Sequence, residues 1–161
     1  MKILTESIHK KTKGAGDFID LTSELHQLLA KSELTEGNMT IFVIGSTAGM
    51  TTFEYEPGLI KDMRELYERI APSNRHYAHN ETWNDDNGFS HVRAALQGPS
   101  LTIPFKDGKL LLGTWQQVVL AEFDIRPHLT FLTTPIPHAI LVDRVTNKGD
   151  SCGRISDSNQ D

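Results

Sequence analysis

The feature that most constrains the fold of this chain is a pair of apolar segments joined by Asp107-Gly108. This dipeptide tolerates positive φ at both central positions of a two-residue turn, and such a turn matches the right-handed twist of paired strands. The sequence therefore predicts an antiparallel hairpin. We expect residues 101–105 to pair with a long strand that covers residues 109–117.

Length and charge limit the kind of protein. With 161 residues, 38% of them hydrophobic, the chain is large enough for one core and too short for two ordinary domains. A net charge of −5 leaves no basic surplus for a nucleic-acid backbone, so no nucleic acid is expected as a partner. No apolar stretch approaches the ~18 residues of a membrane helix, and no signal peptide is recognisable. We expect a cytoplasmic protein without a membrane partner.

The single cysteine of the chain is not expected to have a chemical role. Cys152 lies among polar residues near the C-terminus. One cysteine cannot form a disulfide within the chain, and nothing around this residue indicates an activated thiol. A cysteine-based active site is therefore not expected.

Apolar spacing predicts the remaining elements. Leucines at helical intervals, Pro57 at a first helical position and Gly98 after a short amphipathic run indicate three helices, over residues 21–32, 57–71 and 90–96. Short apolar runs indicate strands, over residues 3–9, 17–19, 39–44, 50–55, 118–120 and 129–132. We expect the first two strands to pair, and residues 39–44 to be buried on both sides with residues 50–55 as their neighbour.

These elements predict an α+β fold. Strands in blocks with few helices favour a single compact domain, in which a mixed or antiparallel sheet carries two main helices and a short one. We place this domain at residues 1–134. Residues 135–161 become rich in Asn, Gly, Ser and Asp, and are expected to form a partly disordered C-terminal extension.

The densest group of functional side chains is the polar segment from His79 to His91. Imidazole and carboxylate groups together suit zinc or manganese, so His79, His91 and Asp85 are candidate metal ligands. The alternative is that Asp85, Asp86 and Asn87 cap the following helix, as short polar side chains commonly do. Both interpretations can hold for different residues.

A second candidate set follows the predicted hairpin. Because strand residues alternate, Gln116 and Glu122 are expected on one face and Trp115 on the other. A buried Gln or Glu needs a partner such as a metal, a substrate amine or an arginine, whereas a surface carboxylate needs none. Trp115 is expected either to stack on a flat heteroaromatic ring or to fill a core or subunit interface.

A small-residue segment follows the apolar run at residues 39–44. Ser46 and Thr47 lie beside Gly45, and such a loop can approach a phosphate group closely. The lysine and the spacing of a P-loop are missing. A plain turn between two strands is the alternative.

Several motifs resemble the secondary thiamine-phosphate synthase (YjbQ-like) family. They are Gly-Thr-Trp-Gln at residues 113–116, Tyr-Ala-His at 77–79, Ser-His-Val-Arg at 90–93 and Gly-Ser-Thr-Ala at 45–48. The resemblance covers residues 2–133. Gly45 and Phe89 stand where other members carry histidine.

The resemblance implies an activity and an assembly. The expected enzyme is a homotrimer that joins a pyrimidine methyl pyrophosphate to a thiazole phosphate, as a weak or secondary activity that yields thiamine phosphate. The implied site has catalytic Asp85, Glu122, Trp115 and Gln116, phosphate contacts from Ser46, Thr47, Arg93 and Arg126, and a zinc, magnesium or manganese ion on His79, His91 and Asp85.

Two other functions remain open on the same residues. A metal-activated water would make the protein a hydrolase of a small phosphorylated metabolite. Without turnover, the chain would be a trimeric protein that binds a small anion or metabolite.

Overall fold

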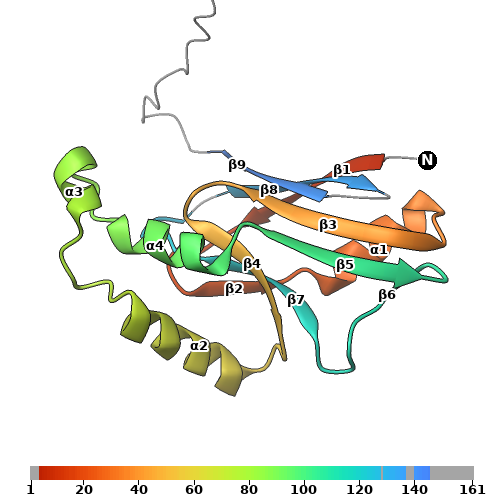
Figure 1. Cartoon of the computed structure of the whole chain (residues 1–161), viewed down its shortest axis with the longest axis horizontal. Helices are drawn as coiled ribbons and strands as arrows, with labels where there is room; N and C mark the ends of the chain where they lie inside the picture. The colour runs from red at the N-terminus through yellow and green to blue at the C-terminus, as the bar shows by residue number, and fades with distance from the viewer. Residues whose placement is uncertain (1–3, 128, 137–139, 146–161) are drawn as a thin grey trace, which may run out of the picture.

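The computed structural model describes the backbone of residues 4–127, 129–136 and 140–145, and the side chains of residues 5–127 (Figure 1). Six strands form one sheet, in the order β1 (Leu4–Lys11), β8 (Leu129–Ile136), β9 (Ile140–Val145), β3 (Glu36–Ile44), β5 (Ser100–Lys106) and β6 (Lys109–Leu110). A second sheet has the order β2 (Asp17–Asp20), β7 (Gln117–Glu122) and β4 (Ala48–Phe53). The β3–β9 pairing is parallel and the other pairings are antiparallel. The predicted α+β domain is confirmed.

The second sheet lies between the first sheet and two helices (Figure 1). Between the two sheets, a core gathers apolar side chains from β1, β3, β4, β5, β7 and helix α1 (Thr22–Ser32). On the far side of β7, Val119, Ala121 and Phe123 pack against Tyr67 and Ala94. Those two residues belong to α2 (Pro57–Ile70) and α4 (Gly88–Gln97). Strand β7 therefore has apolar residues on both faces, as its uninterrupted apolar sequence requires.

Local sequence explains where the helices begin and end. Helix α2 starts at Pro57, which needs no amide partner there, and the Glu56 carboxylate accepts the amides of Gly58 and Leu59. Helix α4 ends at Gly98, whose φ of 85° suits glycine. The three predicted helices are confirmed. Helix α3 (Ala78–Trp83) lies in a stretch that we expected to be loop.

The predicted turn is confirmed, but the long strand after it is wrong. Asp107 and Gly108 have φ of 52° and 68°, and Phe105 pairs with Leu110. Strand β6 ends at Leu110, and further along the chain the amide of Gln116 bonds the carbonyl of Gly113 at 3.0 Å in a local turn. This turn moves the chain from the first sheet to the second, where β7 begins.

Three predicted strand relations are also wrong. The first two strands lie in different sheets, since β1 pairs with β8 and β2 pairs with β7. Strand β3 buries alternate residues, and its other face is exposed or half-buried. Strand β4 pairs with β7 instead of β3.

The expected C-terminal extension is described only in part. Within it, residues 140–145 form β9, paired with β3 and β8. Residues 137–139 and 146–161 lie outside the described residues, so the domain boundary at residue 134 stays a prediction. None of the described helices has the length and hydropathy needed to cross a membrane.

Candidate functional site

Helices α3 and α4 meet closely at the start of α4. The Gly88 amide, at the start of α4, donates to Oδ1 of Asn80 on α3 at 3.1 Å. A Cβ atom on Gly88 would lie 2.5 Å from Cβ of Tyr77. Only glycine therefore allows the two helices this approach.

This approach brings together the two histidines that flank the polar loop. The ring centroids of His79, on α3, and His91, on α4, lie 4.3 Å apart. Oδ2 of Asp85 lies 3.6 Å from Nε2 of His79, and both side chains are about two thirds buried. The structure thus places these three residues near one another, where solvent still reaches them.

Asn87 completes this group. The Asp85 carboxylate only accepts hydrogen bonds, so the amide nitrogen of Asn87 is assigned to the side that faces it, 3.1 and 3.2 Å from the carboxylate oxygens and 3.3 Å from Nε2 of His91. The expectation that this side chain caps α4 is wrong, because Asn87 is the N-cap residue yet makes no side-chain cap bond. Asn80 bonds the first amide of the helix instead. We call His79, Asp85, Asn87 and His91 the histidine cluster.

The histidine cluster is not a complete metal site as it stands. Among the residues whose side chains the structure describes, no three or more His, Cys, Asp or Glu groups converge to hold an ion. His79 and Asp85 are nevertheless near the separation of two ligands on one ion, because tetrahedral zinc ligands at about 2.1 Å are roughly 3.4 Å apart.

Glu122 lies at the end of β7 and is fully buried. Its carboxylate accepts the Thr12 hydroxyl at 3.2 Å and the backbone amides of Phe123 and Asp124 at 3.0 and 2.9 Å. These bonds offset the desolvation of the carboxylate. They hold the turn after β7, which gives Glu122 a structural role in addition to any catalytic one.

Three of the four residues expected to bind phosphate lie close to Glu122 along the chain or through backbone contacts. Thr47 is buried, its carbonyl accepts the amide of Phe123 at 2.9 Å, and exposed Ser46 precedes it. Arg126 is exposed in the loop that follows, and its amide donates to Asp124 at 3.2 Å. The structure thus places Ser46, Thr47 and Arg126 at the same end of β7 as Glu122.

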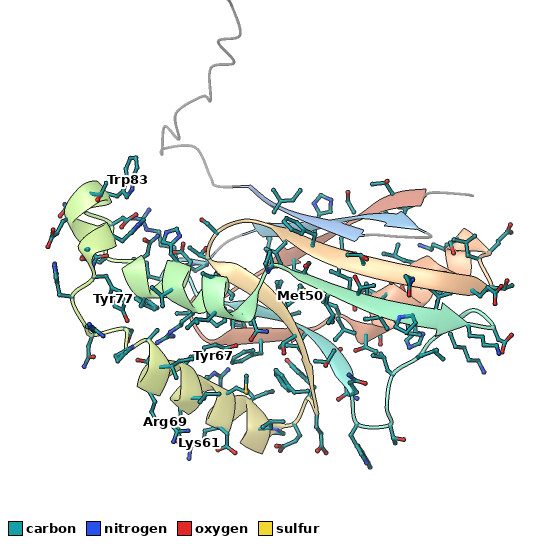
Figure 2. All side chains as sticks on the ribbon, in the orientation of Figure 1. Met50, Lys61, Tyr67, Arg69, Tyr77 and Trp83 are labelled. Carbon is teal, nitrogen blue, oxygen red and sulfur yellow. The ribbon has the colours of Figure 1, made fainter. Side chains whose placement is uncertain are left out.

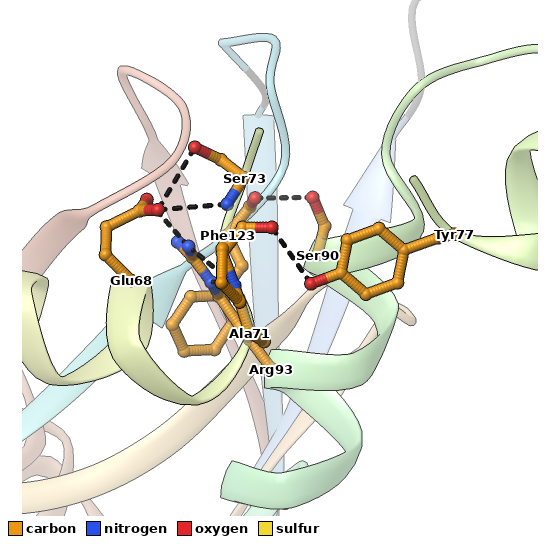
Figure 3. Close-up of polar contacts among 8 residues, drawn as sticks. Glu68, Ala71, Ser73, Tyr77, Ser90, Arg93 and Phe123 are labelled. Carbon is orange, nitrogen blue, oxygen red and sulfur yellow. Dashed lines mark hydrogen bonds and ion pairs between the residues drawn. The ribbon is translucent and has the colours of Figure 1, made fainter. Parts of the chain in front are cut away.

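Arg93 belongs to the interior (Figure 3). It is 3% exposed, and its guanidinium donates twice to the carbonyl of Ala71 and once to Glu68 at 2.7 Å. The centroid of the Phe89 ring lies 4.7 Å from the guanidinium carbon. Arg93 joins α4 to the end of α2, so we remove it from the candidate phosphate contacts.

Trp115 and Gln116 lie at the opposite end of β7 from Glu122. Six strand residues span about 20 Å, which separates the two ends within one chain. Trp115 is 69% exposed, and Gln116 donates to Oγ1 of Thr52 at 3.0 Å. The structure does not bring these two residues to the histidine cluster.

Comparison with known proteins identifies the family. The family model described as UPF0047 protein YjbQ-like matches residues 6–136. The chain belongs to the YjbQ-like UPF0047 family. A UPF0047 protein of Methanothermobacter thermautotrophicus is 34% identical over 124 residues, covering 77% of this chain and 85% of the relative. One from Methanocaldococcus jannaschii is 35% identical over 115 residues, covering 71% and 80%.

Solved structures agree with this YjbQ-like assignment. A YbjQ-like protein of unknown function from Sulfolobus solfataricus P2 superposes with a TM-score of 0.75 at 30% identity, covering 82% of this chain and 94% of that one. A hypothetical protein from Aeropyrum pernix K1 gives 0.74 at 27% identity, covering 83% and 98%. The shared YjbQ-like fold therefore extends over about four fifths of this chain.

Sequence reasoning missed two residues of this YjbQ-like site. Asn87 was assigned only to capping, and its contacts with Asp85 and His91 depend on the turn before α4. Trp83 is 68% exposed at the end of α3 (Figure 2). It comes four residues after His79, so the two side chains share one side of the helix. The helical spacing would have shown this if α3 had been predicted.

Proposed function

We propose that this protein condenses a pyrimidine methyl pyrophosphate with a thiazole phosphate to give thiamine phosphate, as a weak or secondary activity. The observation that carries the proposal is the histidine cluster, where two imidazoles 4.3 Å apart share a solvent-reached site with Asp85. Half-buried ionisable groups from separate helices, which the apolar core does not require, are typical of functional sites. The family motifs supply the choice of substrates.

The reaction needs groups that stabilise two developing charges. The thiazole nitrogen attacks the pyrimidine methylene carbon while the carbon–oxygen bond to pyrophosphate breaks. The ring N–H groups of His79 and His91 would donate hydrogen bonds to the departing pyrophosphate, and the Asp85 carboxylate would stabilise positive charge on the pyrimidine. Arg126 and Ser46, near the end of β7, would contact the phosphate of the second substrate.

Trp83 is the best candidate for contact with the pyrimidine ring. It is exposed and lies on the same side of α3 as His79. Indole faces stack well on flat heteroaromatic rings. This replaces the earlier assignment of the stacking role to Trp115, which lies at the far end of β7.

We also propose that a divalent ion, zinc, magnesium or manganese, binds together with the substrate. His79 and Asp85 supply two ligands, and pyrophosphate oxygens would complete the set, as is usual for magnesium on phosphate substrates. Such an ion would neutralise charge on pyrophosphate. This arrangement agrees with the lack of a complete three-residue metal set among the described side chains.

The deciding experiment combines metal content with turnover. Protein purified without chelator and without a metal-affinity tag is analysed for metals, then assayed for thiamine phosphate with both precursors and the added ion. We expect product, and a loss of about 100-fold in kcat/KM for the His79→Ala/His91→Ala double variant. The matched control is His76→Ala, because His76 is exposed and pairs with Glu81 outside the histidine cluster.

Other outcomes would select the alternatives. Bound metal and release of phosphate from small metabolites, without thiamine phosphate, would indicate a hydrolase. Ligand binding without any turnover would indicate a small-anion or metabolite-binding protein. Equal turnover in the wild type and the double variant would remove the histidine cluster from the mechanism.

We further propose that the protein is a homotrimer, as the family resemblance implies. The exposed apolar side chains Leu111 and Trp115, in the loop between β6 and β7, offer apolar surface for a subunit contact. Light scattering during size-exclusion chromatography measures the mass directly. A mass near three times 18.0 kDa is expected, and a mass of one chain would contradict the proposal.

A further inference from the structure

Ser90 makes a buried hydrogen bond between α4 and the turn after β7. It is the third residue of α4 and is fully buried. Its hydroxyl donates to the carbonyl of Phe123 at 2.6 Å (Figure 3). Ser90 is followed by His91 of the histidine cluster, whereas Phe123 begins the turn that leads to Arg126. The bond therefore joins two segments that carry different groups of the proposed site.

The backbone of Phe123 also holds the loop at residues 45–48. Its amide donates to the carbonyl of Thr47 at 2.9 Å and to the Glu122 carboxylate at 3.0 Å. These bonds fix the turn against β7 and the loop. The hydroxyl of Ser90 adds a directional link from this unit to α4, because a hydrogen bond weakens steeply as its distance and angle change.

Spacing matters for a reaction between two substrates. In the proposed reaction the histidine cluster contacts the pyrophosphate of one substrate, and Arg126 and Ser46 contact the phosphate of the other. The attacking nitrogen and the methylene carbon must lie about 3–3.5 Å apart, and a misplacement of about 1 Å can cost about 100-fold in rate. We propose that Ser90 is a positioning residue, which sets the spacing between these two anion-binding groups without contacting a substrate. Its effect on rate rests on the proposed function, whereas the link from α4 to the turn does not.

A buried hydroxyl can also stabilise a fold without any role in spacing, and Ser32 provides the matched comparison. It is 6% exposed, and its hydroxyl donates to the carbonyl of Leu29 at 2.6 Å. Both residues belong to α1, so this bond does not set the distance between two segments. Ser90→Ala and Ser32→Ala should lower the midpoint of urea unfolding to a similar extent, because each removes a buried hydroxyl donor from a carbonyl.

The first measurement is steady-state turnover with both precursors. Ser90→Ala should lower kcat about tenfold and leave both KM values within about twofold, because each anion-binding group stays intact while their separation changes. Ser90→Cys keeps the side-chain volume and a weaker donor, so it should lower kcat about threefold, and it keeps the test decisive if Ser90→Ala fails to fold. Ser32→Ala should match the wild type. An unchanged kcat in the Ser90 variants, or an equal loss in Ser32→Ala, would overturn the inference.

The second measurement needs no turnover. Spin labels on Ala95→Cys in α4 and Ile125→Cys in the turn, both at exposed positions, report the distance between the two segments by electron paramagnetic resonance. Cys152→Ser removes the native thiol from the labelled protein. We expect one narrow distribution of distances in the labelled parent and in Ser32→Ala, and a broader or shifted one in Ser90→Ala. Identical distributions in all three proteins would overturn the inference.

The two measurements separate this inference from the proposed function. A changed distance in Ser90→Ala, in a protein that makes no thiamine phosphate, would reject the synthase and keep Ser90 as the residue that places the turn against α4. Equal turnover in the wild type and Ser90→Ala, with unchanged distances, would reject the role of Ser90 and keep the synthase.

Discussion

Trp83 and Gly88 lie on α3 and α4, the two helices that carry His79 and His91. Trp83 presents an exposed ring one helical turn after His79. Gly88 lacks the Cβ atom that would hold α3 away from α4. Each residue supports a test that leaves the catalytic groups intact.

The first prediction uses the presence of only two tryptophans in the chain. In Trp115→Phe, Trp83 is the sole indole emitter, and the pyrimidine pyrophosphate should quench its fluorescence by stacking, whereas inorganic pyrophosphate should not. In Trp83→Phe the remaining Trp115 should report no change. Trp83→Ala should weaken pyrimidine binding about tenfold. If the fluorescence of Trp115→Phe does not change when the pyrimidine pyrophosphate is added, Trp83 is not part of the substrate site.

The second prediction concerns Gly88→Ala. The new Cβ would lie 2.5 Å from Cβ of Tyr77 and 2.8 Å from Oδ1 of Asn80, so α3 must move away. We expect a loss of about 1–3 kcal/mol in the free energy of unfolding, together with reduced activity because His79 leaves His91. Urea unfolding and the turnover assay measure the two effects.

The control for this substitution is Gly113→Ala. The nearest atom to its new Cβ would be 3.7 Å away, which is ordinary contact. Equal behaviour of the two alanine variants would show that the close approach of α3 and α4 does not matter.

Residue identity predicted part of this site. The polar loop between His79 and His91 was sufficient to group them with Asp85, because few other positions combine imidazole and carboxylate. The sequence could not show that Arg93 faces the end of α2. An arginine one turn into a helix looks the same in the sequence whether its side chain is buried or exposed to solvent. The contacts of the Asn87 amide could not be predicted either, because an asparagine before a helix is equally suited to capping the helix and to contacting His91.

At the scale of elements, α2 and α4 are joined by a polar contact at one end of their interface. Arg93 reaches from α4 to the carbonyl of Ala71 and to Glu68, and Glu68 also accepts the amide and hydroxyl of Ser73 (Figure 3). Nearby, Tyr67 is buried, which raises its pKa to about 12, and its hydroxyl bonds Gln97 of α4. These contacts hold α4, which carries His91, against α2.

The third prediction is that Arg93→Met lowers the free energy of unfolding by about 2–3 kcal/mol. Methionine keeps much of the apolar stem but leaves the Ala71 carbonyl without its buried donor, and an unsatisfied buried group is costly. Chemical denaturation measures the change. Lys61→Met is the comparison, because Lys61 makes an exposed pair with Glu65 and should change stability by less than about 0.5 kcal/mol.

The fourth prediction is a pH dependence of the same contact. Partial burial raises the pKa of Glu68, but the hydrogen bonds from Ser73 and Arg93 outweigh it, so the pKa lies below its ordinary value of 4.5. A lowered pKa means that the stabilisation is complete above that value and disappears as the pH falls through the pKa of the folded state. The stability difference between wild type and Glu68→Gln should therefore shrink in acid.

Unfolding in urea between about pH 3 and 7 measures this difference. We expect about 1 kcal/mol or less at neutral pH, because the Glu68 side chain is half exposed. A difference that stays constant over the whole range would contradict the assignment.

Elements were easier to predict than their pairing. Pro57, Gly98 and the Asp107-Gly108 turn act within a few residues, and each gave the right boundary. The partner of β1 is β8, more than a hundred residues away, and no local pattern encodes that choice. The long strand over residues 109–117 failed because the turn at Gly113 redirects the chain between sheets.

At the scale of the whole molecule, one core links the two sheets. Leu25 of α1 is fully buried in it, together with residues from both sheets. The fifth prediction is that Leu25→Ala lowers the free energy of unfolding by about 2–5 kcal/mol, measured by denaturation. Leu96→Ala is the control, since Leu96 is 65% exposed and should have little effect.

The position of β8 and β9 in the first sheet also determines how the protein can be made. These strands leave the ribosome after the other described strands, yet they lie between β1 and β3, which leave it earlier. During synthesis the hairpin of β5 and β6 can form as soon as both strands have been made. Strand β1 keeps an unpaired edge until β8 has been made. Contacts of such long sequence separation make folding slow and leave strand edges exposed in the meantime. A nascent chain that stops at residue 127 would lack the middle of this sheet, and its open edges would be sites for chaperone binding or aggregation.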